Sequence, residues 1–302
     1  MEIENCPFSQ QKISSKGGFV SLSPELCYMQ PKSGGEEMAG TLRGIFTVRW
    51  KPTKDLAVMA LSIILVVGAL YTATVVVTPD VGGGMPYFFL YAGLMAVVLG
   101  VGLPLFWMVI VRKRPLADLG LTFKNLRRSL ALQTLLAILL YITGLKIQAE
   151  SFETVIPLVA LALCIGFFEA VFWRGWVLNR LEEAFGILPG IVAGSVLYSI
   201  YHVGYGMALD EMVFLFFIGI MFAVVFKLTG SIFILWPVFQ PMGQLITLSK
   251  EGLDLPLIAS VGFIEALAVM VALVWLAQKY LRRYQQKSLT GNPSFYLKEA
   301  VL

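Results

Sequence analysis

The chain of 302 residues is poor in charged residues. They make up 14 % of it, whereas soluble domains average about 25 %, and 58 % of the residues are hydrophobic. A soluble protein of this size would need many more polar side chains to cover its surface. The composition therefore excludes a soluble enzyme and a disordered chain, and predicts that most of the outer surface faces lipid.

Histidine and cysteine are also scarce. His202 is the single histidine, and the three cysteines, Cys6, Cys27 and Cys164, have no CxxC spacing. Zinc sites usually draw on several His and Cys ligands, so few ligands are available here, and scattered cysteines predict no disulfide framework. HExxH, GxGD, GxSxG, GxGxxG and P-loop motifs are all missing from the sequence. Their absence argues against zincin, aspartyl, serine-hydrolase and nucleotide-binding chemistry.

Eight apolar segments are long enough to cross a membrane. A helix needs about 20 mainly apolar residues to span a hydrocarbon core of roughly 30 Å. The candidate spans are residues 55–77, 86–111, 129–147, 155–178, 188–206, 211–229, 231–248 and 256–278. Pro237 and Pro241 interrupt the seventh span. The predicted fold is all-α, a polytopic membrane helix bundle with about eight transmembrane helices.

Basic residues fall on one side of this predicted topology. They gather before the first span, between the second and third, and after the eighth. Cytoplasmic loops are enriched in Lys and Arg, so both termini are predicted to be cytoplasmic. Topology and anionic lipid account for the basic residues, and no nucleic-acid partner is predicted. They are Arg43, Arg49, Lys51, Lys54, Arg112, Lys113, Arg114, Lys124, Arg127, Arg128, Lys279, Arg282, Arg283 and Lys287.

The chain is expected to have three parts. Residues 1–54 form a polar cytoplasmic extension without the features of a cleaved signal peptide, residues 55–278 a transmembrane domain, and residues 279–302 a basic cytoplasmic tail. Within the domain, residues 115–128 (PLADLGLTFKNLRR) are predicted to form an amphipathic helix on the cytoplasmic membrane surface.

The ionisable residues that need an explanation within the predicted spans are Glu169 and Arg174 in the fourth, His202 in the fifth, Lys227 near the end of the sixth and Glu265 in the eighth. Lys227 can snorkel to the cytoplasmic surface. Charged groups inside a membrane are costly, so each is a candidate for a functional site. Each also has a structural interpretation, as a protonated or snorkelling side chain packed between helices. Glu169 and Arg174 are five residues apart, about 140° around an α-helix, and are not expected to pair.

Glu169 and His202 together suggest a reaction. A glutamate on one helix and a histidine on the next can hold a water molecule between them. The carboxylate would take the proton, and the imidazole would orient the water or stabilise the oxyanion. Tyr198 lies one turn before His202 on the same helix face. This is a minimum apparatus for peptide hydrolysis without a metal.

Three short patterns follow one another along the chain. They are EAVFWRG at residues 169–175, YSIYH at 198–202, and a run through Gln240 and Gln244. They resemble the EExxxRG, FxxxH and HxxxN motifs of the CPBP family, the CAAX-processing and bacteriocin-processing intramembrane proteases. LADLGL at 116–121 is similar to a cytoplasmic segment before that family's core. The resemblance covers about residues 110–250.

The sequence departs from the family pattern at three positions. Ala170 replaces the second glutamate, which would lie four residues before Arg174 and pair with it. Gln240 and Gln244 replace His and Asn; their amides can donate hydrogen bonds but cannot change charge. Glu265 lies outside the motifs and could compensate as a partner of Arg174 or of the glutamines. It could equally be a protonated glutamate packed between helices.

The resemblance implies an intramembrane endopeptidase that cleaves a peptide or protein substrate at the lipid bilayer. Glu169 would be the general base on water, and His202 would position the water or stabilise the tetrahedral intermediate. Gln240 and Gln244 would be substitute oxyanion donors, and Arg174 would order the site. This chemistry requires no cofactor. Two alternatives remain: a catalytically impaired relative that binds membrane peptides or acts as a scaffold, and a proton-coupled transporter that uses the membrane carboxylates and the histidine.

Overall fold

The computed structural model describes residues 46–77, 84–142, 151–250 and 252–289. The chain divides into two units, Met1–Thr41 and Leu42–Leu302, and the described residues all belong to the second. Most of the predicted extension and the end of the predicted tail lie outside these residues. Within them every regular element is a helix, which confirms the all-α class.

The helices are of α, 3₁₀ and π type, and several join end to end into longer rods. Two rods begin at an N-cap: the Thr53 hydroxyl accepts the Leu56 N–H, and the Ser151 hydroxyl accepts the Thr154 N–H. Each cap satisfies an amide that has no partner inside the helix. The elements are α2 (Lys54–Tyr71), η1 (Thr72–Val77), α3 (Met85–Phe88), η3 (Phe89–Gly102), α4 (Leu103–Leu105), η4 (Phe106–Val111), η5 (Leu116–Leu119), α5 (Leu126–Ile142), α6 (Phe152–Glu169), η6 (Ala170–Leu178), α7 (Asn179–Phe185), α8 (Ile187–Tyr201), η7 (His202–Tyr205), α9 (Leu209–Lys227), η8 (Ile232–Ile234), α10 (Phe239–Lys250) and α11 (Ala259–Leu289).

Six helical rods of the described chain are long and apolar enough to cross a membrane. They are Lys54–Val77, Met85–Val111, Phe152–Phe185, Ile187–Tyr205, Leu209–Lys227 and Ala259–Gln286. Each coincides with one of the eight predicted spans. The chain is therefore an integral, multi-pass membrane protein built as a helix bundle, although the count of eight is not confirmed.

The third and seventh predicted spans differ from the others. The third corresponds to α5, whose described part has 17 residues; its predicted continuation to residue 147 lies outside the described residues. The prediction of one continuous helix for the seventh span, residues 231–248, is wrong. The 3₁₀ turn η8 comes first, and the 12-residue α10 begins only after Pro237. Proline lacks an N–H and its ring clashes with the preceding turn, which explains the break.

Residues 115–128 do not form the predicted surface helix. The short turn η5 ends at Gly120, where φ is +67°, and Asn125, with φ +61°, leads into α5. Leu119 is fully buried, and the Gly120 carbonyl accepts the Ile232 N–H at 3.0 Å. Two left-handed positions break the helix, and the first part of the segment packs into the bundle through Leu116 and Leu119.

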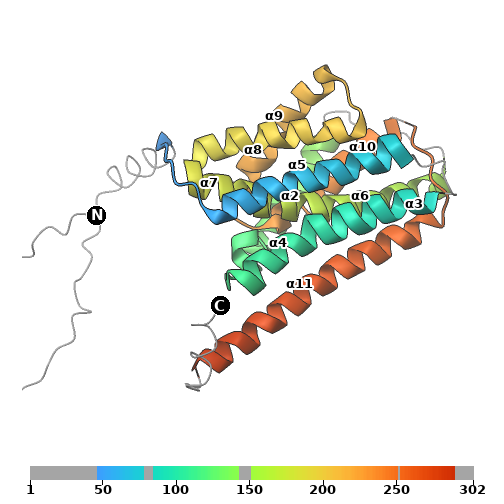
Figure 1. Cartoon of the computed structure of the whole chain (residues 1–302). Helices are drawn as coiled ribbons and strands as arrows, with labels where there is room; N and C mark the ends of the chain where they lie inside the picture. Colours follow the sequence, from blue (N-terminus) through green and yellow to red (C-terminus); the bar gives the residue numbers. More distant parts are fainter. Residues whose placement is uncertain (1–45, 78–83, 143–150, 251, 290–302) are drawn as a thin grey trace, which may run out of the picture. The chain divides into compact units, whose positions relative to one another are not determined.

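The rod of α6, η6 and α7 forms the centre of the bundle. In its most apolar window 78 % of the residues are buried, against 17 % in the corresponding window of α11. α6 packs against η3, α10 and α11, while α8 packs against α7 and α9 (Figure 1). A polar side chain on the central rod can therefore reach partners on several helices without meeting lipid.

The helix ends that the sequence assigns to the cytoplasm lie together. The buried carboxylate of Asp55, at the start of α2, pairs with Arg112 at 3.0 Å and with Arg180 of α7 at 4.0 Å. Lys227, at the end of α9, pairs with Glu182 of α7 at 2.6 Å. These ends share one side of the bundle, as the distribution of basic residues requires. Which side is cytoplasmic stays a prediction.

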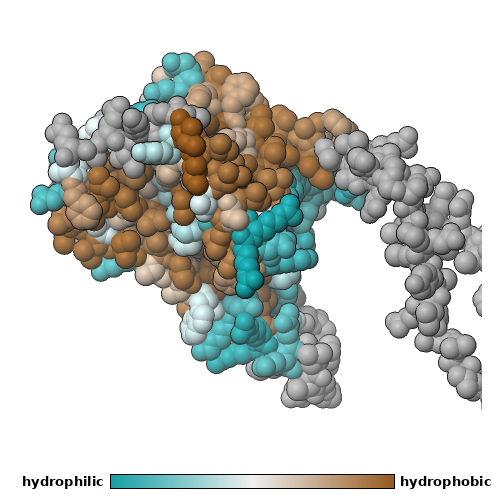
Figure 2. All heavy atoms as spheres, turned by 180° about the vertical axis from the view of Figure 1, so that it is seen from behind, coloured by the Kyte–Doolittle hydropathy of each residue, from teal (hydrophilic) through white to brown (hydrophobic). Residues whose placement is uncertain are grey.

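The outer surface is largely hydrophobic. Figure 2 shows hydrophobic residues over most of the described atoms of one face, with hydrophilic residues gathered apart from them. Large exposed side chains on α9 and α11 include Phe214, Phe217, Val261 and Trp275. A surface of this kind would associate in water and is suited to a bilayer.

Candidate active site

Glu169 is the last residue of α6, and it is 3 % exposed. Four side-chain donors from two other helices surround its carboxylate. The Tyr201 hydroxyl donates to Oε1 at 2.8 Å. At Oε2, the amides of Gln240 and Gln244 donate at 2.7 and 2.9 Å, and the Tyr198 hydroxyl lies at 3.4 Å. Because all four groups donate, the surroundings suit the ionised carboxylate, which only accepts.

Close packing lets α10 approach α6 beside this carboxylate. A Cβ at Gly166, three residues before Glu169, would lie 2.9 Å from Cγ of Pro241, so a larger residue would push the helices apart. The chain leading into α10 is held from another side, since the Val238 N–H donates to Oε1 of Gln133 in α5 at 3.1 Å. These contacts fix the depth at which the two glutamines meet the glutamate.

A row of tyrosine hydroxyls continues from the carboxylate. The hydroxyl of Tyr201 lies 3.2 Å from that of Tyr205, which lies 2.9 Å from that of Tyr91 in η3. The sequence assigned no role to these three residues. The i, i+4 spacing of Tyr201 and Tyr205 in an apolar helix is a signal that could have found two of them. Nothing in its local sequence marks Tyr91.

His202 packs beside Tyr198 and Tyr201 and does not contact the Glu169 carboxylate through a hydrogen bond in the described structure. Its Nδ1 is 2.8 Å from the Tyr198 carbonyl oxygen, and its ring centroid is 4.4 Å from that of Tyr201. A carbonyl oxygen can only accept, so Nδ1 carries the hydrogen and Nε2 of the neutral ring is the acceptor. In the described structure no hydrogen bond joins His202 to Glu169; Tyr201 contacts both.

Arg174 is buried, at 2 % exposure, and the described residues offer its two terminal nitrogens no hydrogen-bond partner. Its guanidinium carbon lies 4.8 Å from the centre of the Tyr198 ring and 5.7 Å from that of Phe222. A desolvated cation–π contact contributes about 2 kcal/mol, whereas burying a charge costs several kcal/mol. The rings therefore offset only part of the cost.

The helix around Arg174 is of π type, which the sequence did not predict. Hydrogen bonds from i to i+5 in η6 bring residues five apart nearer to one face than an α-helix would. Glu169 and Arg174 nevertheless form no ion pair within 4.0 Å in the part of the chain that is described. The expectation that these two charges do not pair agrees with the geometry, although the angle behind it assumed an α-helix.

Other buried polar atoms near the carboxylate also lack partners among the described residues. They are Oε1 of Gln240, Oε1 of Gln244 and the indole nitrogen of Trp173, whose ring contacts Tyr198 and Tyr201. Buried polar groups in native proteins are nearly always satisfied, by water or a ligand where protein atoms do not serve. The region around Glu169 is therefore suited to binding water or a polar ligand.

Glu265 does not join this region. It is exposed on α11 and makes no hydrogen bond or ion pair with Arg174, Gln240 or Gln244 in the described structure. Of the two alternatives for Glu265, compensation as a partner of Arg174 or the glutamines is therefore contradicted, and its exposure does not fit a glutamate packed between helices either. Its position also separates it from any continuous relay through Glu169.

The side chains around Glu169 do not suit a metal ion. Among the described residues, no group of three His, Cys, Asp or Glu side chains could hold one. The four donors present N–H and O–H hydrogens to the carboxylate, whereas a metal ion requires lone pairs.

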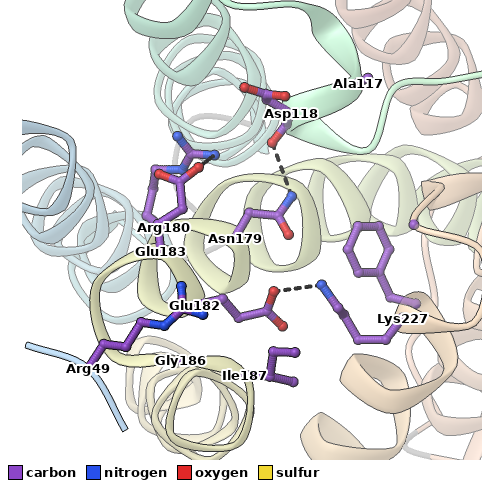
Figure 3. A pocket seen from close by; sticks show the side chains of 12 residues that line it. Arg49, Ala117, Asp118, Asn179, Arg180, Glu182, Glu183, Gly186, Ile187 and Lys227 are labelled. Atoms are coloured by element: carbon purple, nitrogen blue, oxygen red, sulfur yellow. Dashed lines mark hydrogen bonds and ion pairs between the residues drawn. The ribbon is translucent and has the colours of Figure 1, made fainter. Parts of the chain in front are cut away.

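An open polar cavity of about 460 Å³ lies elsewhere, beside α7 (Figure 3). Its charged side chains largely pair with one another: Lys227 with Glu182 at 2.6 Å, and Arg180 with Glu183 at 3.0 Å. Paired charges of this kind are typical of a structural role. None of the predicted site residues lines the cavity, which is formed by Arg49, Ala117, Asp118, Asn179, Arg180, Glu182, Glu183, Gly186, Ile187, Phe226, Lys227 and Gly230.

Comparison with known proteins assigns a family to the central part of the chain. The sequence profile of the family described as type II CAAX prenyl endopeptidase Rce1-like matches residues 151–238. No curated protein and no solved structure matches the chain. The matched segment contains Glu169 and His202 and ends two residues before Gln240. Residues 151–238 therefore match a model of the Rce1-like family, in agreement with the resemblance that the sequence motifs carry.

Proposed function

We propose that this protein is an intramembrane endopeptidase of the CAAX- and bacteriocin-processing type, which cleaves a peptide or protein at the membrane with water activated by Glu169. The observation that carries the proposal is the set of four donors around a carboxylate buried within the family segment. Hydrogen bonds to a carboxylate favour the ionised form that a general base needs, and they offset part of the cost of burying its charge.

Oε1 of Glu169 is the oxygen that would take the proton. Oε2 already accepts hydrogen bonds from Gln240 and Gln244, whereas Oε1 accepts only from Tyr201. A carboxylate oxygen has two lone pairs, so Oε1 keeps one for a water molecule. The water would donate to Oε1 as its oxygen attacks the peptide carbonyl. Glu169 would then pass the proton to the leaving amine when the tetrahedral intermediate collapses.

His202 fits one of its two predicted roles better than the other. Its Nδ1–H is committed to the Tyr198 carbonyl, so Nε2 can accept a hydrogen from the attacking water but cannot donate to an oxyanion. The oxyanion would instead be met by the second N–H of the Gln240 or Gln244 amide, because each bonds Glu169 with one hydrogen only. Removing one such donor typically costs a factor of about 10²–10³ in turnover.

The test is hydrolysis of quenched fluorescent peptides by the purified chain in detergent. Glu169→Ala is expected to slow cleavage by at least about 100-fold, the lower range for a general base. Glu265→Gln is the matched control: it changes a membrane glutamate on the exposed face of α11 and should leave the rate unchanged. If Glu169→Ala cleaves as fast as the unmodified chain, the mechanism is wrong.

A catalytically impaired peptide binder is the second candidate, and the two glutamines favour it. Their amides hold Glu169 but cannot exchange protons as a histidine can. This candidate predicts that the unmodified chain binds peptides without cleaving them. It also predicts that Glu169→Gln retains that binding, measured by fluorescence anisotropy of labelled peptides.

A further inference from the structure

Arg174 is a buried cation without a counterpart. Its side chain is almost fully enclosed, and no described residue accepts a hydrogen bond from its two terminal nitrogens. The faces of the Tyr198 and Phe222 rings lie beside the guanidinium, but neither ring contributes a lone pair in its plane. A buried charge that has lost its partner is strongly destabilising. Water or a bound anion is therefore expected at these nitrogens.

The acidic side chains near Arg174 do not serve this purpose. Glu169 is held by four other donors and forms no ion pair with the arginine. Glu265 is exposed on another helix. Among the described residues, therefore, no acidic side chain hydrogen-bonds the terminal nitrogens of Arg174.

The π-helix η6, which contains Arg174, indicates the position that the anion would occupy. Residue 170 lies four residues before Arg174, slightly less than one turn away in the π-helical segment that contains both. It is alanine here and is completely buried, so this turn supplies no acceptor. Glutamate differs from alanine by Cγ, Cδ and two carboxylate oxygens. Those four atoms correspond to an acetate ion.

We propose that Arg174 binds a small carboxylate anion, in the place that a side-chain carboxylate at position 170 would take. The planar guanidinium would donate to it through both terminal nitrogens, the geometry that arginine forms with carboxylates. The indole N–H of neighbouring Trp173 is a further buried donor without a partner among the described residues. The anion is either a free carboxylate such as acetate or the carboxylate of a bound peptide. The inference does not depend on peptidase activity.

The test follows thermal unfolding of the full chain in detergent by tryptophan fluorescence. Sodium acetate or formate is titrated at constant ionic strength, with sodium sulfate as the balancing salt. The melting temperature of the unmodified chain is expected to rise saturably, by about 3 °C at ten times the dissociation constant. A short peptide with a free carboxyl terminus, compared with its amide, distinguishes a peptide carboxylate from a free one.

Two variants at position 170 make the test specific. Ala170→Glu supplies the carboxylate internally, so it should melt higher without acetate and lose the acetate shift. Ala170→Gln introduces a side chain of the same size as glutamate without its charge, so its melting temperature should rise less. Arg174→Gln should abolish the shift; if this variant fails to fold, the pair at position 170 decides. No saturable shift with acetate, formate or free-acid peptide would overturn the proposal, and so would a full acetate shift in Ala170→Glu.

Discussion

Replacing Tyr201 by phenylalanine tests whether the donors around Glu169 organise its carboxylate. The change removes one hydroxyl, which donates to Oε1 at 2.8 Å, and keeps the ring that packs on His202. Tyr198→Phe is a matched control on the same helix. Its hydroxyl faces the same carboxylate but lies 3.4 Å from Oε2, beyond the usual range of about 2.5–3.0 Å for O–H···O bonds.

The two variants should differ in stability by a measurable amount. A hydrogen bond to a charged group contributes about 1.5–3 kcal/mol, so Tyr201→Phe should lower the free energy of unfolding by that amount. Tyr198→Phe should cost less than about 1 kcal/mol, because a long, poorly formed bond contributes little. At about 2–4 °C per kcal/mol, Tyr201→Phe should melt about 3–12 °C below the unmodified chain.

Thermal unfolding in one detergent, followed by tryptophan fluorescence, measures both variants against the unmodified protein. The reasoning is refuted if the two variants melt at the same temperature. It is also refuted if Tyr198→Phe is the more damaging change. Either result would mean that the carboxylate is not held chiefly through Oε1 by Tyr201.

Two further changes test the packing that supports the site. Gly166→Ala places a Cβ 2.9 Å from Pro241 and should lower both the melting temperature and the rate of peptide cleavage. Gly68→Ala is the control and should change neither, because no atom lies within 4 Å of its Cβ. Equal melting temperatures of the two variants would contradict the close approach of α10. Asp55→Asn removes the charge of a buried carboxylate that pairs with Arg112 at 3.0 Å, and should cost about 1.5–3 kcal/mol in unfolding free energy. The exposed control Asp210→Asn should cost less than about 1 kcal/mol, and a similar loss in both variants would show that the Asp55 ion pairs are not stabilising.

The six long spans were predictable because length and apolar composition are the only requirements for crossing a bilayer. The two errors occur where backbone geometry overrides composition. Pro237 breaks a run of apolar residues that is otherwise long enough. Positive φ at Gly120 and Asn125 breaks the helix that the residue pattern of 115–128 predicted on the membrane surface.

The candidate site was only partly predictable. Glu169, Gln240 and Gln244 were chosen from motif positions, and their side chains lie in direct contact. The role of Tyr201 could not be predicted, because it depends on the relative depth of two helices. That depth is set by tilt and by the π-helical turns, and neither leaves a signal in hydropathy.

The glutamines lead to a last prediction, for the pH dependence of cleavage. A bell-shaped profile of kcat/KM requires an essential acid as well as an essential base. Around Glu169 the groups on α10 are amides, which do not titrate, and the Nε2 of His202 serves as an acceptor in its neutral form. Protonating either Glu169 or His202 would stop the reaction, so the rate should rise with pH and then level off without a falling limb. Cleavage assays between about pH 5 and 8 measure this, with Gln240→His as the variant that reintroduces a titrating group on α10. A falling limb in that range for the unmodified chain would mean that a second proton-donating group takes part, and that the glutamines are not the partners of Glu169 in the reaction.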